Sequence, residues 1–96
     1  PAFPPDRDGL LFVFPEDGQH GFWMKDMAYA IDIMWFDADG SLVHIEERVA
    51  PETYPESFRS STPARYVLET RAGFVAERAL ELGAELDLTG ADFTVE

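Results

Sequence analysis

The chain has 96 residues, of which 46% are hydrophobic, and it carries a formal net charge of −12 with no cysteine. This charge disfavours nucleic-acid and anionic-lipid partners, and the lack of cysteine excludes disulfides and thiolate metal sites. No apolar run reaches the ~18 residues that indicate a membrane-spanning helix. We therefore expect a single domain over residues 1–96 with one modest core and no membrane-spanning segment.

Acidic residues are spread along the whole chain, which has 19 Asp and Glu against seven Lys and Arg. An acidic chain with a single lysine resembles the proteins of halophiles, whose carboxylates maintain solubility in concentrated salt; an ordinary acidic domain is the alternative. The chain begins at Pro1 and so resembles a processed piece. Both a cytoplasmic and an exported or surface-anchored location therefore stay open.

The first part of the chain predicts a loop followed by two short strands. Residues 1–9 are rich in proline and predict an arm or loop. Residues 10–14 form a short apolar run that is typical of a buried strand. After a turn region, residues 22–27 alternate loosely and predict a second strand, which would place Trp23 and Lys25 on the same face.

A hairpin is the clearest structural prediction of the sequence. Residues 31–37 and 41–49 both alternate between apolar and polar side chains. Between them, the sequence Asp-Ala-Asp-Gly at 37–40 is typical of a tight turn, because Gly40 tolerates a left-handed backbone.

A loop and another strand follow the hairpin. Residues 50–63 contain three Pro and many polar residues, and we expect a loop that Tyr54 and Phe58 attach to the body. A loop of about a dozen residues is often functional. Residues 64–70 alternate and predict a strand.

One helix is expected, at about residues 72–82, where apolar side chains recur every three or four positions. Residues 84–88 and 93–95 predict two more short strands. Many short strands with a single helical crossover favour an antiparallel sandwich or barrel. The alternative is an α+β sheet with the helix packed on one face.

Lys25 is the only lysine, and it lies among large apolar residues. With the indole of Trp23 as a stacking platform, its ammonium group could contact an anionic or hydroxylated ligand. The alternative is a structural ion pair with an acid such as Asp26, Asp32 or Glu69.

Asp32 lies between Ile31 and Ile33, where a buried carboxylate must be paired, hydrogen-bonded or protonated, unless that face is wet. Glu69 would share a strand face with Arg65, and an ion pair between them is the simplest interpretation. The two histidines, His20 and His44, are too few for a zinc site by themselves and are more typical of a solvated turn and a half-buried strand. We expect no metal site and no cofactor.

Several blocks of sequence together resemble a known family. They are Leu-Leu-Phe-Val-Phe-Pro at 10–15, Phe-Trp-Met-Lys-Asp-Met at 22–27, Ile-Asp-Ile at 31–33, Phe-Asp-Ala-Asp-Gly at 36–40, Pro-Ala-Arg-Tyr-Val-Leu-Glu at 63–69 and Ala-Gly-Phe at 72–74, with Gly83 following. This order resembles the bacterial and archaeal "domain of unknown function 192" family over about residues 9–88. The resemblance implies a small, mainly β, jelly-roll-like sandwich or barrel with one helix, and no established activity.

The chain also departs from the family pattern. Asp26 stands where the family usually has asparagine, and His20 stands where arginine is common. The cysteine pair that many relatives carry in the loop matching residues 50–63 is absent, so no disulfide closes that loop. The first strand that the family usually has before Leu10 is missing. Members of the family include exported, lipid-anchored and cytosolic proteins.

Three functional hypotheses follow. The first is a non-enzymatic module that binds a carbohydrate or another small polar ligand, with a loop around Tyr54 as a lid and no catalytic residues. The second is a hydrolase that uses a carboxylate pair such as Asp32 and Glu69, with Lys25 stabilising negative charge. The third is a purely structural accessory domain. The ligand-binding residues predicted for the first hypothesis are Trp23, Lys25, Asp26, Asp32, Tyr54, Tyr66 and Glu69.

Overall fold

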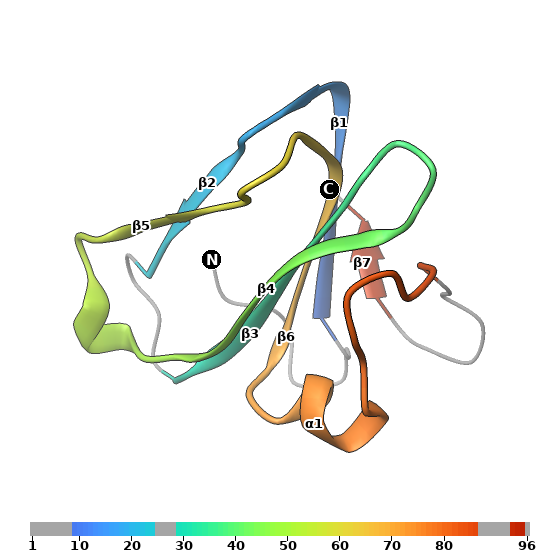
Figure 1. The fold of residues 1–96 in the computed structure, drawn as a ribbon. Helices are drawn as coiled ribbons and strands as arrows, with labels where there is room; N and C mark the ends of the chain where they lie inside the picture. The colour runs from blue at the N-terminus through green and yellow to red at the C-terminus, as the bar shows by residue number, and fades with distance from the viewer. Residues whose placement is uncertain (1–8, 25–28, 87–92, 96) are drawn as a thin grey trace.

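The protein is mainly β, with one short helix (Figure 1). The structure, a computed structural model, describes residues 9–24, 29–86 and the backbone of 93–95. A five-stranded sheet has the order β4-β3-β6-β1-β7, and a two-stranded sheet pairs β2 with β5. The bounds in chain order are β1 Gly9–Gly18, β2 Gly21–Trp23, β3 Ile31–Phe36, β4 Leu42–Val49, η1 Pro51–Thr53, β5 Ser57–Arg59, β6 Ala64–Arg71, α1 Phe74–Arg78 and β7 Phe93–Val95.

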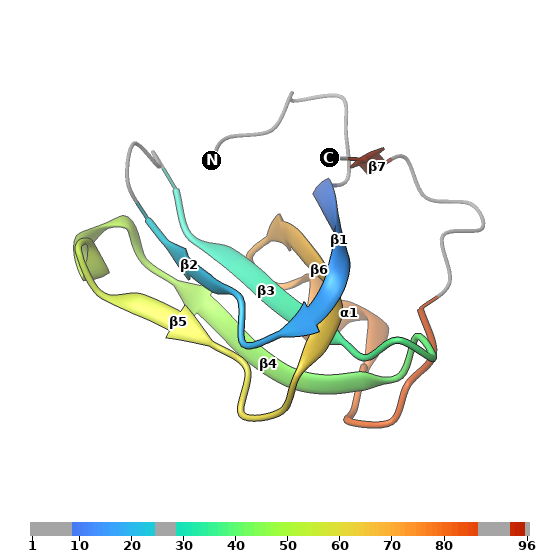
Figure 2. The ribbon, with the colours of Figure 1, turned by 90° about the horizontal axis from the view of Figure 1, so that it is seen from above.

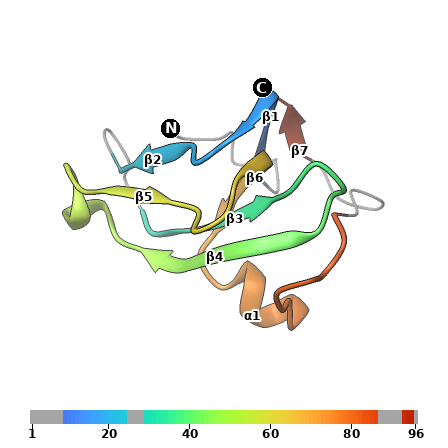
Figure 3. The same ribbon diagram turned by 45° about the horizontal axis from the view of Figure 1, so that its top comes forward.

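The elements form layers on the two faces of the five-stranded sheet. In Figure 3, β2 and β5 lie above the strands β3 and β4, and α1 lies below them. Side-chain alternation along the strands divides the core in the same way, because neighbours in a strand point to opposite faces. The face toward the small sheet buries Leu10, Met24, Ile31, Ile33, Trp35, Val49, Ala64 and Val67. The face toward α1 buries Leu11, Met34, Phe36, Leu42, Leu68 and Val75.

Aromatic packing attaches the small sheet to the large one. Phe22 and Phe58 are directly paired across β2 and β5, and both side chains pack against the core of the large sheet. The Phe22 ring lies 6.2 Å from the ring of buried Trp35 at an edge-on angle of 73°. The indole of Trp35 also donates a hydrogen bond to the carbonyl oxygen of His20 at 2.9 Å, so it fixes the chain leading into β2.

The predicted hairpin is confirmed as β3 and β4, which are antiparallel (Figure 2). The carboxylate of Asp37 accepts hydrogen bonds from the backbone N–H groups of Asp39 and Ser41, and Gly40 has a φ of 83°. A left-handed residue at this position suits glycine, which has no Cβ to collide with the backbone.

Other elements differ from the sequence predictions. The predicted loop at 50–63 contains η1 and the strand β5, because Phe58 pairs with the distant Phe22. The predicted sandwich-like, mainly antiparallel fold with one helix is confirmed, and within it β7 pairs with β1 in parallel at one edge of the large sheet.

The helix is confirmed but is shorter than the predicted range of 72–82. It ends at Arg78 because Ala79 takes a left-handed conformation with a φ of 52°. The apolar spacing continued to Leu82, but that side chain is 65% exposed. Within the described part of the chain, no helix has the length and apolarity needed to cross a bilayer.

Candidate functional site

The residues predicted to form one polar cluster are dispersed over three places in the described structure. Trp23 and Tyr54 meet on the small sheet and the loop beside it. Asp32 and Tyr66 lie on the face of the large sheet that carries α1, whereas Glu69 lies on the opposite face. Lys25 and Asp26 fall outside the described residues.

The carboxylate of Asp32 joins three elements of the fold. Its side chain is fully buried. One oxygen accepts a hydrogen bond from the backbone N–H of Arg48 at 2.9 Å, and the other accepts one from the N–H of Val75, also at 2.9 Å. Arg48 has a φ of 53°, so Asp32 satisfies the N–H of an irregular residue in β4 and an N–H in the first turn of α1. The prediction that a buried Asp32 needs hydrogen-bond partners is confirmed, and these partners are two backbone N–H groups.

Glu69 is the other fully buried acid of the described residues. Within this part of the chain, neither oxygen of its carboxylate has a hydrogen-bond partner. In the sheet, Glu69 stands directly between Leu10 of β1 and Ile33 of β3. Desolvation in this apolar setting raises the pKa of Glu69 from 4.5 to about 7. The expected ion pair with Arg65 is wrong, because Arg65 donates to the carboxylate of Asp17 instead, at 2.8 Å.

The strand register separates the two carboxylates of the hydrolase hypothesis. Glu69 is paired with Ile33, so these two side chains share a face. Asp32 is the neighbour of Ile33 in the strand and therefore points to the other face. The prediction that Asp32 and Glu69 meet is wrong, and the pair cannot act together on one substrate.

Trp23 and Tyr54 are brought together from separate parts of the chain. Their ring centroids are 5.1 Å apart with an interplanar angle of 51°. Trp23 remains 45% exposed and Tyr54 43% exposed, although both are large aromatic side chains. Trp23 lies next to Phe22 in β2, and since Phe22 points into the core, Trp23 points to the outer face of the small sheet. We call these two residues the aromatic pair.

Tyr66 is not part of this group. It is paired with Phe36 in the sheet and packs half-buried against the core on the α1 side.

The two histidines are engaged in local contacts. The ring of His20 stacks on that of Phe14 with 3.6 Å between the ring centroids, and the ring of His44 lies 2.9 Å from a carboxylate oxygen of Glu46. Among the described residues, no three His, Cys, Asp or Glu side chains are arranged to hold a metal ion.

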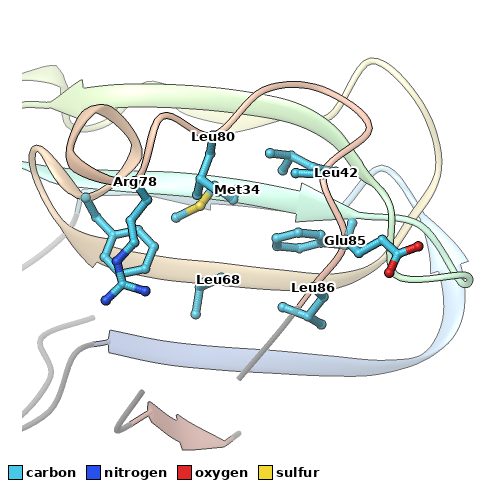
Figure 4. Close-up of a pocket in the computed structure, with 10 residues that line it drawn as sticks. Met34, Leu42, Leu68, Arg78, Leu80, Glu85 and Leu86 are labelled. Atoms are coloured by element: carbon cyan, nitrogen blue, oxygen red, sulfur yellow. The ribbon is translucent and has the colours of Figure 1, made fainter. Parts of the chain in front are cut away.

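The structure also contains an apolar groove that the sequence did not reveal (Figure 4). Its volume is about 170 Å³, and it lies between the large sheet and the segment that runs from α1 to residue 86. The lining residues are Met34, Phe36, Leu42, Leu68, Phe74, Arg78, Leu80, Ala84, Glu85 and Leu86. Leu80 and Leu86 were visible in the sequence as apolar residues, but only the early end of the helix shows that they border a groove.

Comparison with known proteins identifies the family. The model of the family DUF192, described as "Uncharacterized ACR", matches residues 2–88. The chain belongs to this family. No curated protein matches this DUF192 chain.

Two solved structures resemble the DUF192 chain. A candidate transcription regulator from Sinorhizobium meliloti 1021 is 31% identical with a TM-score of 0.79, over 90% of this chain and 65% of that one. A protein of unknown function from Novosphingobium aromaticivorans DSM 12444 is 24% identical with a TM-score of 0.75, over 82% of this chain and 56% of that one. The DUF192 chain thus spans less than two thirds of the length of either protein, and the second likeness concerns the fold alone.

Proposed function

We propose that this protein is a small non-enzymatic domain that binds a carbohydrate or a similar polar ligand with one apolar face. The observation that carries the proposal is the exposed aromatic pair, Trp23 and Tyr54. Each of the two residues is more than 40% exposed, although their rings pack against each other. Large aromatic side chains placed in this way are typical of recognition surfaces, where an apolar ring and a polar tip serve together.

The chemistry of the pair suits a hydroxylated ring. The C–H face of a sugar can pack on the indole or the phenol, and the phenol O–H of Tyr54 can hydrogen-bond to a hydroxyl group. Lys25 follows Trp23 by two residues in the sequence. We include Lys25 and Asp26 in the proposed site, where their charges would select and orient the ligand.

The buried carboxylates support a binding role rather than hydrolysis. Both oxygens of Asp32 are used by backbone donors, and Glu69 lies inside the apolar core. Neither acid is positioned to protonate or attack a ligand held by the aromatic pair.

Direct contact with DNA is not part of the proposal, although one relative is a candidate transcription regulator. A net charge of −12 opposes binding to a phosphate backbone, which depends on clusters of Lys and Arg.

The test is a titration with monosaccharides and short oligosaccharides in low salt and in molar salt, followed by tryptophan fluorescence and by thermal shift. We expect a saccharide to bind the wild-type protein and to bind Trp23→Ala or Tyr54→Ala about fivefold more weakly, because an aromatic stack contributes ~1 kcal/mol. Val13→Ala is the matched control, since Val13 is also 45% exposed but lies outside the pair. Lys25→Met should weaken binding with little loss of stability.

Two results would contradict the proposal. One is that Trp23→Ala and Val13→Ala bind every saccharide equally. The other is that no saccharide binds while both aromatic substitutions lower the Tm far more than Val13→Ala, which would support a purely structural role.

A further inference from the structure

We infer that the apolar groove beside α1 is a second binding site, which takes a small monocarboxylate carrying one compact apolar group such as an aromatic ring. The groove lies on the face of the large sheet opposite to the small sheet, so it is independent of the aromatic pair. The inference rests on the shape of the groove, its lining and the position of one arginine.

The sheet provides an apolar floor, and the chain after it provides the walls. Met34 of β3 and Leu68 of β6 are almost fully buried and directly paired in the sheet. The half-buried side chains of Phe74, Leu80 and Leu86 also line the groove, and Figure 4 labels Leu80 and Leu86 among them. These side chains offer no hydrogen bond to water, so an apolar group is a better occupant than solvent.

The backbone holds the wall in place. The N–H of Leu80 donates to the carbonyl oxygen of Val75 at 3.1 Å, which fixes the turn after α1. Further along, Leu42 donates to the carbonyl oxygen of Ala84 at 2.7 Å, and Leu86 donates to that of Gly40, also at 2.7 Å. The wall is therefore bonded to the turn of α1 at one end and to β4 and the hairpin turn at the other, and the groove is formed before a ligand arrives.

The volume sets the size of the occupant. A volume of about 170 Å³ is close to that of an engineered apolar cavity of ~150 Å³ that accepts benzene. One aromatic ring or one branched alkyl group fits this space, whereas a long acyl chain does not.

Arg78 sets the charge of the occupant. Its guanidinium lies over the ring of Phe74, with 4.5 Å between the guanidinium carbon and the ring centroid. Among the described residues, no carboxylate forms an ion pair with it. A guanidinium oriented by a ring can still donate two parallel hydrogen bonds to a carboxylate. Figure 4 shows Glu85 at the opposite end of the groove, where it would repel a carboxylate and so favour one orientation.

The test is a titration with benzoate, followed through the methyl signals of Met34 and Leu68 in ¹H–¹³C NMR. We expect saturable shifts of both signals, and we expect benzyl alcohol and benzylamine to bind at least about threefold more weakly, because neither can form the ion pair with Arg78. Arg78→Gln should abolish the preference for benzoate. Arg59→Gln is the matched control, because Arg59 is an exposed arginine that contacts the carbonyl oxygen of Gln19 away from the groove.

Both substitutions change exposed side chains, so both variants should fold and give interpretable titrations. The inference is overturned if benzoate leaves the two methyl signals unchanged at saturating concentration. It is also overturned if benzyl alcohol binds as tightly as benzoate, or if Arg78→Gln keeps the preference that Arg59→Gln keeps. None of these outcomes depends on saccharide binding at Trp23, so the two proposals can fail separately.

Discussion

Replacement of Glu69 by glutamine should stabilise the protein relative to the wild type, by an amount that grows as the pH rises. The pKa of this carboxyl is about 7 in the folded protein, raised from 4.5 by desolvation. Between these two pH values, the folded state holds a proton that the unfolded chain has released. The stability associated with Glu69 is therefore complete below pH 4.5 and is lost as the pH rises through 7.

The magnitude follows from the two pKa values. They differ by 7 − 4.5 = 2.5. At ~1.4 kcal/mol for each pH unit, this amounts to a loss of about 3 kcal/mol by pH 8. The glutamine amide would be neutral at every pH and nearly isosteric with the protonated acid. We therefore expect Glu69→Gln to match the wild type near pH 4.5 and to exceed it by about 3 kcal/mol at pH 8.

The assay is urea unfolding from pH 4.5 to 8, monitored by the fluorescence of the buried Trp35. The matched control is Glu77→Gln, because Glu77 is exposed on α1 and its loss changes the net charge by the same amount. The difference in unfolding free energy between the two variants removes the general effect of the acidic surface. A difference that stays flat with pH would refute the reasoning. A difference of opposite sign would show that Glu69 is ionised and paired in the folded protein.

Two further substitutions test the packing of the sheet. Asp32→Asn should lower the unfolding free energy by about 3 kcal/mol, because an amide oxygen and an NH₂ group cannot accept from both backbone donors. The control Asp39→Asn changes an exposed side chain and should stay within ~0.5 kcal/mol of the wild type in the same urea titration. Equal effects of the two substitutions would show that the two hydrogen bonds of Asp32 add no stability. Gly9→Ala should cost at least ~2 kcal/mol, since its Cβ would overlap the backbone carbonyl oxygen of Glu69, whereas Gly18→Ala meets only a side chain at 3.2 Å and should lower the Tm much less.

The sequence predicted the elements whose signals are local. The hairpin of β3 and β4 follows from alternation on both sides of a turn whose residues bond to one another, as the contacts of Asp37 show. The alternation of the sequence did not predict β5, because Phe58 becomes part of a strand only by pairing with Phe22, which lies 36 positions away. The helix was predicted too long since periodicity alone cannot detect that Ala79 turns left-handed.

The candidate site shows the same limit. Asp32 and Glu69 were both recognised as unusual acids in apolar strands, and both are fully buried. Which face each acid occupies depends on the register between β3 and β6, and alternation within one strand does not give that register. The aromatic pair was named residue by residue, but its contact joins β2 to the loop after η1 and is visible only in three dimensions.

The parallel pairing of β1 with β7 has a consequence for the order in which the chain folds. Gly9 is paired with Phe93, which is 84 residues away, whereas Met34 and Ile45 of the hairpin are 11 residues apart. Closing the longer loop costs ~2 kcal/mol more in chain entropy. We therefore expect the hairpin to form early and the β1–β7 edge to close late, with slow overall folding for a chain of this size. Until that edge closes, β1 is held in the large sheet by β6 alone.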